Sequence, residues 1–333
     1  MSINYPKTVF ISGGTGSFGK AFLRKNIENS KFIKKIIVFS RDEFKQYKLQ
    51  DELKNHKNFH KLRFFLGDIR DLKRLNRALE GVDIVVHAAA LKQVDTAEYN
   101  PSEFVKTNII GTENIVTASI NQNVNKVISL STDKAASPIN LYGATKLCAE
   151  KIVLAANNTV GKKKITFSVV RYGNVASSRG SVIPSFYSQK KKGFLKITDP
   201  KMTRFNISLD QSVDFVLKSI KLSKGGEIFV PKMTSYNIVD LANTIAPKAK
   251  KKIIGIRPGE KIHEELVGKH ESVNTFDMGN FYIIVNKSNN SQKIEKYYKS
   301  LKKSKQMKEG FTYTSENNKN RLNVKQLKKI IDN

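Results

Sequence analysis

The sequence predicts an α/β fold in which a doubly wound parallel sheet is followed by a smaller α/β domain. Six short runs rich in valine and isoleucine alternate with amphipathic helical stretches through the first half of the chain. The runs are apolar almost throughout, as is typical of strands that are buried on both faces of a parallel sheet. Alternation of such strands with helices indicates a doubly wound arrangement. The alternation becomes irregular after about residue 180, which indicates that a second unit begins there.

The six strands are expected in order along the first half, with helices between them, for example over residues 19–27 and 71–80. The strand segments are 7–13, 34–40, 61–68, 82–90, 126–132 and 165–173. The tail beyond about residue 286 is polar and lysine-rich, but its apolar spacing predicts a short helix that docks on the rest of the chain. The apolar positions of this helix are Leu322, Val324, Leu327, Ile330 and Ile331.

The composition is that of a globular protein from a reducing compartment. The 333 residues are enough for one large or two ordinary domains, and 39% of them are hydrophobic. The first residues lack a signal-peptide pattern, and no apolar run approaches the roughly 20 residues of a membrane helix. The single cysteine, Cys148, excludes a disulfide framework, so we expect a cytoplasmic protein with Cys148 in its core. No metal site is expected.

The formal net charge is +30, and most of the excess is lysine. Such a charge can attract nucleic acid or an anionic membrane. The lysines are scattered, however, with denser runs only at 162–164, 190–192 and 250–252, as is typical of solvated surfaces. We therefore expect no nucleic-acid partner, and expect the charge to favour a phosphorylated small molecule.

A glycine-rich turn follows the first predicted strand and opens a helix. Gly13, Gly16 and Gly19 give the spacing G-x-x-G-x-x-G, and bare backbone amides at a helix N-terminus can approach a pyrophosphate. The strand-turn-helix context is the one that supports dinucleotide binding. The predicted contacts from this turn are Gly13, Thr15, Gly16, Ser17, Phe18 and Gly19.

The end of the second strand indicates which dinucleotide is bound. Enzymes that prefer NAD usually place a carboxylate there, whereas this chain has Ser40 and Arg41, with Lys45 one helical turn later. A hydroxyl and two cations suit a 2′-phosphate, so we expect NADP. Asp42 can either cap the following helix or reach the ribose, and the cap is favoured. Asp68 can either meet the adenine or cap a helix. Residues 1–178 are thus expected to form a Rossmann-like NADP-binding domain, and residues 179–333 a substrate domain, with some of the later chain returning to the first.

The segment after the fifth strand carries the predicted chemistry. Tyr142 and Lys146 are four residues apart, so both side chains lie on one face of a helix. A nearby ammonium lowers the pKa of a phenol, and a phenolate can take a proton from a sugar hydroxyl. Thr132 precedes this helix at a strand end, and Asp133 and Lys134 place an acid beside a base.

With these motifs, the chain resembles the extended short-chain dehydrogenase/reductase family. It is most similar to the inverting UDP-N-acetylglucosamine 4,6-dehydratases, which feed pseudaminic acid and related bacterial sugars. The resemblance covers essentially the whole chain, and the segments that carry it are GGTGSFGK, FSRDE, HAAALKQV, EYNPSEFVKTNIIGTEN, LSTDKAASPINLYGATK, VVRYGNV, KMTRF and IRPGEKIHEEL. The Asp-Lys step discriminates within the family, because epimerases lack it and retaining dehydratases typically have Asp-Glu. Asp95 departs from the pattern, which commonly has proline there.

The resemblance implies an NADP-dependent lyase. Hydride leaves C4 of the sugar, Lys134 removes the C5 proton, Asp133 protonates the departing C6 hydroxyl, and the hydride returns to C6. A base must be neutral, and we expect burial and the charges of Lys146 and the oxidised cofactor to lower the pKa of Lys134. Burial is expected to keep a proton on Asp133, and the pair is expected to titrate as one unit.

Further site residues are implied by the resemblance alone. Lys92 either approaches the nicotinamide or the sugar, or is a solvated loop residue; Asn108 supports the active-site helix. The small residues Ala88 and Ala89 are expected beside the cofactor, and His87 is expected to pack there without chemistry. The predicted substrate contacts are Lys92, Asn174, Arg204, Arg257 and Glu260, the last of which alternatively forms a salt bridge with Lys261 or Arg257.

Two other functions remain open from the sequence. A nucleotide-sugar 4-epimerase also oxidises C4 but returns the hydride to the same carbon, so it needs no acid-base pair. A non-enzymatic NADP-sensing regulator needs none of Tyr142, Lys146, Asp133 and Lys134. The dehydratase is favoured because it accounts for all four residues. Relatives are commonly oligomeric, so a homo-oligomer is expected.

Overall fold

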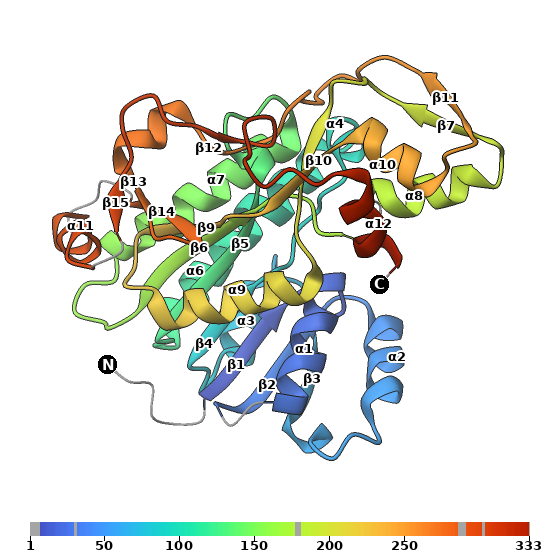
Figure 1. Cartoon of the computed structure of the whole chain (residues 1–333). Helices are drawn as coiled ribbons and strands as arrows, with labels where there is room; N and C mark the ends of the chain where they lie inside the picture. Colours follow the sequence, from blue (N-terminus) through green and yellow to red (C-terminus); the bar gives the residue numbers. More distant parts are fainter. Residues whose placement is uncertain (1–6, 30–31, 177–180, 286–290, 302–303, 333) are drawn as a thin grey trace.

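The computed structural model describes residues 7–29, 32–176, 181–285, 291–301 and 304–332. Within these ranges, one sheet of ten strands runs through the molecule (Figure 1) in the order β15-β13-β14-β9-β6-β5-β4-β1-β2-β3. Its strands are β1 (Lys7–Ser12), β2 (Ile33–Ser40), β3 (Leu62–Leu66), β4 (Ile84–His87), β5 (Lys126–Thr132), β6 (Thr166–Tyr172), β9 (Glu227–Pro231), β13 (Thr275–Asp277), β14 (Phe281–Val285) and β15 (Lys305–Gln306).

The six strands predicted from the sequence are all present, and all pair in parallel. The chain reverses direction across the sheet between β1 and β4, which is the doubly wound arrangement that the alternation predicted. The fold class is therefore confirmed. One detail differs, because β3 is an edge strand and is only partly buried, whereas burial on both faces was expected.

Later parts of the chain extend the same sheet. β9 pairs in parallel with β6, and β14, β13 and β15 then add antiparallel strands. Their apolar side chains, such as Phe229, Phe276 and Ile283, belong to the same hydrophobic core as β1 and β5.

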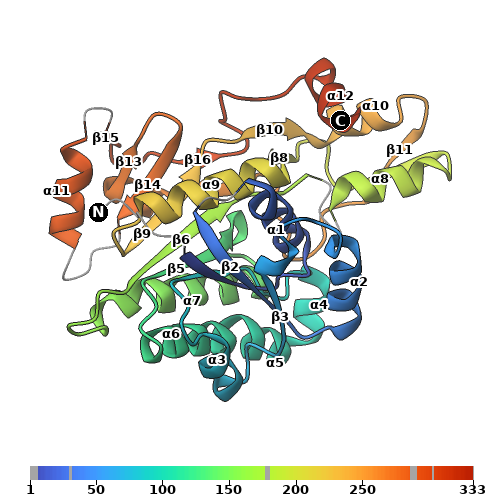
Figure 2. The same ribbon diagram turned by 90° about the horizontal axis from the view of Figure 1, so that it is seen from below.

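Helices cover both faces of the sheet (Figure 2). On one side lie α1 (Ser17–Asn29) and α9 (Leu209–Leu222), and on the other lie α3 (Leu72–Ala78), α6 (Gly111–Asn121) and α7 (Leu141–Ala155). The remaining helices of this part are α2 (Glu43–Leu53), η1 (Phe59–Lys61), α4 (Val94–Tyr99), α5 (Pro101–Phe104), the π-helical η2 (Val105–Ile110), η3 (Asp133–Ala135), η4 (Ala156–Asn158), η5 (Lys269–Asn274) and α11 (Ser291–Lys299). Asp42 caps α2, because its Oδ1 accepts from the amide of Lys45 at 2.9 Å, so the cap interpretation is confirmed.

A second, smaller core lies beyond the carboxyl ends of the parallel strands (upper right in Figure 1). It is built mainly from α8 (Val182–Lys190), α10 (Ile238–Ile245), α12 (Val324–Asp332) and β7 (Phe194–Ile197), and the largely exposed β11 (Lys250–Ile253) pairs with β7. Two further strand pairs, β8 (Thr203–Asn206) with β10 (Thr234–Asn237) and β12 (Glu265–Val267) with β16 (Tyr313–Thr314), complete the described elements. The predicted domain boundary at residues 178 and 179 lies outside the described residues, and the two-domain division remains a prediction.

The tail forms the expected docked helix, α12, which packs against α10. Leu322 and Leu327 are buried in the smaller core, whereas Val324 and Ile330 are exposed. The prediction for Cys148 was wrong, because this residue is exposed. Helix α7 buries the face that carries Tyr142 and Lys146, and Cys148 falls on the opposite side. Across the described ranges, none of the helices has the length and apolarity needed to cross a bilayer.

Candidate active site

A cleft of about 770 Å³ lies over the carboxyl ends of the parallel strands, between the sheet and the smaller core. It brings together residues from both halves of the chain. The predicted site residues that line it are Gly13, Gly16, Ser17, Phe18, Gly19, Ala88, Lys92, Thr132, Asp133, Lys134, Tyr142, Lys146, Asn174, Arg204, Arg257 and Glu260. Those that do not line it are Thr15, Ser40, Arg41, Lys45, Asp68 and Ala89.

The glycine turn joins β1 to α1 and forms one end of the cleft. Gly13 has φ +69°, and the amide of Gly16 donates to the Gly13 carbonyl at 2.9 Å. A Cβ on Gly13 would lie 2.9 Å from the amide nitrogen of Ala89, so no side chain fits between the turn and the end of β4. The bare backbone of this turn, open to the cleft beside the N-terminus of α1, fits a dinucleotide pyrophosphate.

His87 supports this turn from below, as expected. Its Nδ1 lies 2.8 Å from the hydroxyl of Ser12, which also accepts from the amides of Ala88 and Ala89, and its Nε2 lies 3.0 Å from the hydroxyl of Thr112. Burial, with the charge of Lys146, lowers the pKa of His87 to about 3. The imidazole is therefore neutral and structural.

The crowding at Gly13 leads to a testable expectation. Gly13→Ala should weaken dinucleotide binding by at least about tenfold, because the new Cβ pushes the turn away from Ala89. Gly81→Ala is the matched control, since Gly81 has φ +68° but nothing within 4 Å of the added Cβ. Both variants should lose roughly 1 kcal/mol of unfolding free energy from the positive φ. Titration calorimetry with NADP and with NAD should find dinucleotide affinity changed only in Gly13→Ala, and equal affinities in the two variants would contradict the assignment.

Two positively charged side chains, those of Arg41 and Lys45, follow the end of β2, beside the glycine turn. The side chain of Arg41 is half exposed and lies 3.5 Å from a carboxylate oxygen of Asp68, while Lys45 pairs with Asp42. Ser40 is buried, and its hydroxyl accepts from Nε2 of Gln46 at 3.0 Å. Ser40 is thus already bonded within the protein, whereas Arg41 is accessible.

Asp68 lies at the end of β3 and does not cap a helix. Its carboxylate accepts from the amide and guanidinium of Arg70, and the cap of α3 is Asp71 instead. The cap alternative for Asp68 was therefore wrong. Burial alone would raise the pKa of Asp68, but Arg70 and Arg41 hold it below its ordinary value, so the side chain is an anion.

Tyr142 and Lys146 are buried side by side on α7, facing the cleft. Nζ of Lys146 donates to the carbonyl of Leu130 at 2.9 Å, and burial lowers the pKa of Lys146 to about 8. The expected low pKa of Tyr142 is not found. Burial raises it to about 12, although the charge of Lys134 and a hydrogen bond with Thr132 act in the opposite direction. The phenol is protonated in this state of the protein.

Asn108 holds the active-site helix in place, as expected. It lies in the π-helical η2, where its side-chain amide exchanges two hydrogen bonds of 2.9 Å with the backbone of Leu91. Its Nδ2 also donates to Thr145 on α7 at 3.1 Å. Through these bonds, Asn108 connects the loop after β4 to α7.

Asp133 and Lys134 form the turn η3, directly after β5. Thr132 begins this turn, and its hydroxyl donates to Oδ1 of Asp133 at 2.9 Å. Nζ of Lys134 donates to the same Oδ1 at 3.1 Å and lies 3.3 Å from Oε1 of Glu264. Burial raises the pKa of Asp133, as expected, and the charge of Glu264 acts in the same direction. Acid and base therefore lie in contact, facing the cleft.

The expectation for Lys134 itself was wrong. Burial by itself would lower its pKa, but Asp133 and Glu264 outweigh burial and raise the pKa above its ordinary value. Glu264 was missed from the sequence because it is 130 positions away from Lys134. The only signal was its place in the segment IRPGEKIHEEL, where it is one of three acidic residues.

The cleft wall also includes three of the predicted substrate contacts, Arg204, Arg257 and Glu260. Arg204 donates to the carbonyls of Thr203 and Ile262 at 2.7 and 2.9 Å and to that of Lys261, so most of its N–H groups are already bonded. Arg257 is half exposed and pairs with Glu260 and, at 3.4 Å, with Asp95. The salt-bridge interpretation of Glu260 is thereby confirmed.

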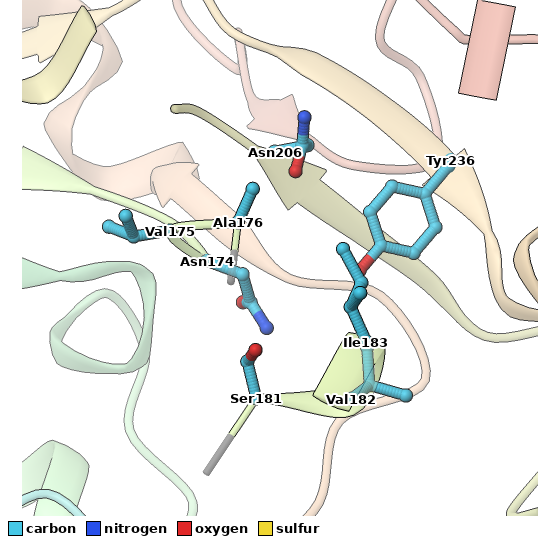
Figure 3. A pocket seen from close by; sticks show the side chains of 8 residues that line it. All are labelled: Asn174, Val175, Ala176, Ser181, Val182, Ile183, Asn206 and Tyr236. Carbon is cyan, nitrogen blue, oxygen red and sulfur yellow. The ribbon is translucent and has the colours of Figure 1, made fainter. Parts of the chain in front are cut away.

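Asn174 lies where this wall meets the smaller core. Figure 3 shows its side chain pointing toward that of Ser181, below Tyr236. Oδ1 of Asn174 and the hydroxyl of Ser181 are buried and have no hydrogen-bond partner among the described residues. Lys92 lines the cleft near Lys134, and burial together with the charge of Lys134 lowers its pKa. In the described part of the chain, no group of three or more His, Cys, Asp or Glu side chains is arranged to hold a metal ion.

Comparisons with known proteins agree with this geometry. A family described as "Polysaccharide biosynthesis protein" matches residues 9–286. The inverting UDP-N-acetylglucosamine 4,6-dehydratase of Campylobacter jejuni is 46% identical over 335 residues, covering 98% of this chain and 97% of that protein. The UDP-glucose 4-epimerase of Rickettsia akari is 43% identical over 334 residues, covering 98% and 95%. The crystal structure of Pen from Bacillus thuringiensis superposes with a TM-score of 0.88 at 37% identity, covering 99% and 98%. The chain therefore belongs to the polysaccharide biosynthesis protein family, within the extended short-chain dehydrogenases/reductases.

Proposed function

We propose that the chain is a UDP-N-acetylglucosamine 4,6-dehydratase that binds NADP, inverts C5 and releases a UDP-2-acetamido-2,6-dideoxy-4-hexulose. The observation that carries the proposal is the contact of 3.1 Å between Lys134 Nζ and Asp133 Oδ1 in a cleft that also contains Tyr142. Elimination of water from a sugar needs a base and an acid next to each other, and oxidation at C4 needs a group that removes a hydroxyl proton. The relative from Campylobacter jejuni is named for this same activity.

NADP, when bound, would accept the hydride from C4 and return it to C6. The glycine turn at Gly13, Gly16 and Gly19 would hold its pyrophosphate, and Arg41 with Lys45 would face its 2′-phosphate. The chain's own part in the oxidation is to take the proton of the C4 hydroxyl. Tyr142 does this once its pKa falls from about 12, and a cation placed near its phenol in the assembled complex would lower it.

Asp133 and Lys134 can reach their reactive forms by a single proton transfer. In the ligand-free protein Lys134 is an ammonium, and moving one proton from Nζ to Oδ1 creates a neutral amine and a carboxylic acid together. The amine then removes the C5 proton, and the acid protonates the C6 oxygen as the C6–O bond breaks. Each residue ends in the charge state from which it began, so the pair needs no proton from solvent for elimination.

The second candidate is a nucleotide-sugar 4-epimerase, which the name of the Rickettsia akari relative favours. An epimerase also needs Tyr142 and Lys146 but has no step for a buried acid and base in contact. Burial of such a pair is costly unless it has a function or is fully hydrogen-bonded, and Oδ2 of Asp133 has no partner among the described residues. The dehydratase accounts for this feature.

One experiment separates the two. The purified protein is incubated with NADP and UDP-N-acetylglucosamine in deuterium oxide, and the sugar is followed by NMR. We expect a 4-keto-6-deoxy sugar with deuterium at C5 and the C5 configuration reversed. A galacto-configured product without loss of water would establish the epimerase and overturn the proposal.

The choice of NADP is tested at Arg41. Arg41→Ser should reduce the preference for NADP over NAD by about 10–100-fold, because a guanidinium contact with a phosphate contributes roughly 1.5–3 kcal/mol. Arg77→Ser is the control, since Arg77 is an exposed arginine at the end of α3. The ratio of kcat/KM for the two cofactors measures the effect. An unchanged ratio in Arg41→Ser would show that the 2′-phosphate is bound elsewhere.

The remaining proposals concern the whole protein. Residues 1–178 would hold NADP and residues 179–333 the nucleotide sugar, with some of the later chain returning to the first domain. The smaller core, whose buried residues all follow position 181, supports a division of this kind. We propose a cytoplasmic homo-oligomer without a nucleic-acid partner. Sedimentation velocity of the purified protein tests the oligomer, and filter binding at low salt tests the nucleic acid.

A further inference from the structure

Glu264 lines the cleft, and a segment near the C-terminus holds its backbone in place. Its amide donates to the hydroxyl of Ser315 at 2.9 Å, and its carbonyl accepts from the amide of Ser315 at 2.8 Å. This anchor lies at the pairing of β12 with β16, so a segment close to the C-terminus fixes the position of Glu264. Its side chain is only 3% exposed.

The carboxylate of Glu264 faces Lys134. Its Oε1 lies 3.3 Å from Nζ of Lys134 and 3.6 Å from Nε of Arg204. Its Oε2 is buried without a hydrogen-bond partner among the described residues, and the same is true of Oδ2 of Asp133. The ammonium of Lys134 is thus in contact with two buried carboxylates, each of which keeps one unbonded oxygen.

A purely structural ion pair is the alternative interpretation, and this chain contains one for comparison. Arg171 is fully buried and bonds both carboxylate oxygens of Glu150 and both of Glu271. A buried structural carboxylate is expected to be saturated in this way, because an unbonded buried oxygen costs free energy. Glu264 is not saturated, and most N–H groups of its neighbour Arg204 are directed to backbone carbonyls.

We propose that Glu264 is a positioning residue for the elimination step, which holds Nζ of Lys134 beside Asp133 and stabilises the positive charge that forms on it. This inference rests on the proposed function. When the C5–H bond breaks, the proton goes to Nζ and the electron pair becomes the C5–C6 double bond. The C6–O electron pair leaves with the oxygen, which takes the proton of Asp133. Glu264 exchanges no atom in this step, and the cation that its carboxylate contacts in the pair is Lys134, at 3.3 Å.

The charge of Glu264 should matter for C5 and not for C4. An anion 3.3 Å from Nζ holds the amine beside Asp133, and removal of the C5 proton depends on that placement. Oxidation at C4 involves Tyr142, whose pKa the charge of Glu264 raises, though less than burial does, so loss of that charge should not slow this step. Loss of the charge should therefore separate the two steps, whereas a structural defect should impair both.

The test uses Glu264→Gln, which keeps the shape of the side chain and removes its charge. Exchange of the C5 proton in deuterium oxide should slow by about 10–100-fold, while the rate of cofactor reduction by substrate should stay within about threefold. Glu316→Gln is the matched control, because Glu316 is exposed and pairs with His263, away from Lys134. Glu264→Asp keeps the negative charge, but its shorter side chain moves that charge away from Nζ of Lys134. The rate of C5 exchange should therefore lie between those of the parent and Glu264→Gln.

A second readout is independent of activity. In the ligand-free protein, acetylation of Lys134 by acetic anhydride is followed against pH by mass spectrometry of its peptide. The pH at which Lys134 becomes reactive should fall by at least about one unit in Glu264→Gln and stay unchanged in Glu316→Gln.

An unchanged labelling profile in Glu264→Gln, or equal losses of C5 exchange and cofactor reduction, would overturn the proposal. If Glu264→Gln does not fold, an elimination rate of Glu264→Asp equal to the parent's would overturn it. Failure of the parent protein to form a 4-keto-6-deoxy sugar, with the labelling shift still present, would reject the proposed function instead.

Discussion

Replacement of Lys134 by methionine is expected to slow formation of the 4-keto-6-deoxy product by about 10²–10⁴-fold, the usual contribution of a general base. Methionine has a similar length and no proton-accepting nitrogen, so C5 exchange into deuterium oxide should be lost to the same extent. Reduction of the bound dinucleotide by UDP-N-acetylglucosamine should be slowed much less, because Tyr142 and Lys146 are present and only the charge of Lys134, which lowers the pKa of Tyr142, is lost. Stopped-flow absorbance and NMR of the sugar measure the two steps separately.

Lys232→Met is the matched control for this experiment. The side chains of Lys134 and Lys232 are both 24% exposed, and both lysines pair with a carboxylate, which for Lys232 is Asp277 at 2.7 Å. Lys232 does not line the cleft. Lys232→Met should therefore keep full activity. If Lys134→Met still exchanged the C5 proton at the parent's rate, Lys134 would not be the base.

Replacement of Arg171 by methionine is expected to give the largest loss of stability, about 3–5 kcal/mol in unfolding free energy. The guanidinium is buried and lies 2.6 Å from Glu150 on α7 and 2.8 Å from Glu271 on η5. It also donates to the carbonyl of Leu266 on β12 at 3.0 Å. Its removal leaves two buried carboxylates without a cation, so the variant should unfold at lower urea concentration.

The pH dependence gives this prediction a second test. Burial alone would raise the pKa of Glu271, but Arg171 holds it below its ordinary value. Such a carboxyl contributes stability above the ordinary glutamate pKa of about 4.3, and this contribution is lost as the pH falls through the lower, folded value. In Arg171→Met the unpaired carboxyl of Glu271 takes up a proton more readily, so the deficit relative to the parent should shrink as the pH falls toward 4.

Arg24→Met provides the control for charge removal. Arg24 pairs with Glu52 at 2.5 Å, but both side chains are exposed to solvent by more than a third. A solvated pair contributes about 0–1 kcal/mol, so this variant should unfold almost as the parent does. Equal losses of unfolding free energy in Arg24→Met and Arg171→Met would show that burial does not increase the contribution of the Arg171 ion pairs to stability.

The parts of the site that follow from the sequence are those set by local geometry. The spacing of Gly13, Gly16 and Gly19 specifies a turn, because glycine permits the positive φ found at Gly13. The spacing of Tyr142 and Lys146 places both side chains on one helical face, whatever surrounds the helix. Asp133 and Lys134 are neighbours in the chain, so their presence at the end of one strand was certain once that strand was identified.

The parts that could not be predicted depend on contacts between distant segments. Cys148 is exposed because α7 turns its other face to the sheet, and this rotation is set by the packing around Tyr142 and Lys146. The protonation of Lys134 depends on Glu264, which reaches the cleft through β12 and its partner strand near the C-terminus.

The sequence by itself determined the class of fold and the turn that fits a dinucleotide, and it placed Asp133, Lys134 and Tyr142 among the residues proposed for the chemistry. These features depend on backbone conformation and on residues close together along the chain. Only the tertiary structure decided the charges of these groups and which of the basic residues are already bonded, as Arg204 is. The reason is that a pKa depends on burial and on charges within a few ångströms, and those neighbours come from segments more than a hundred residues away.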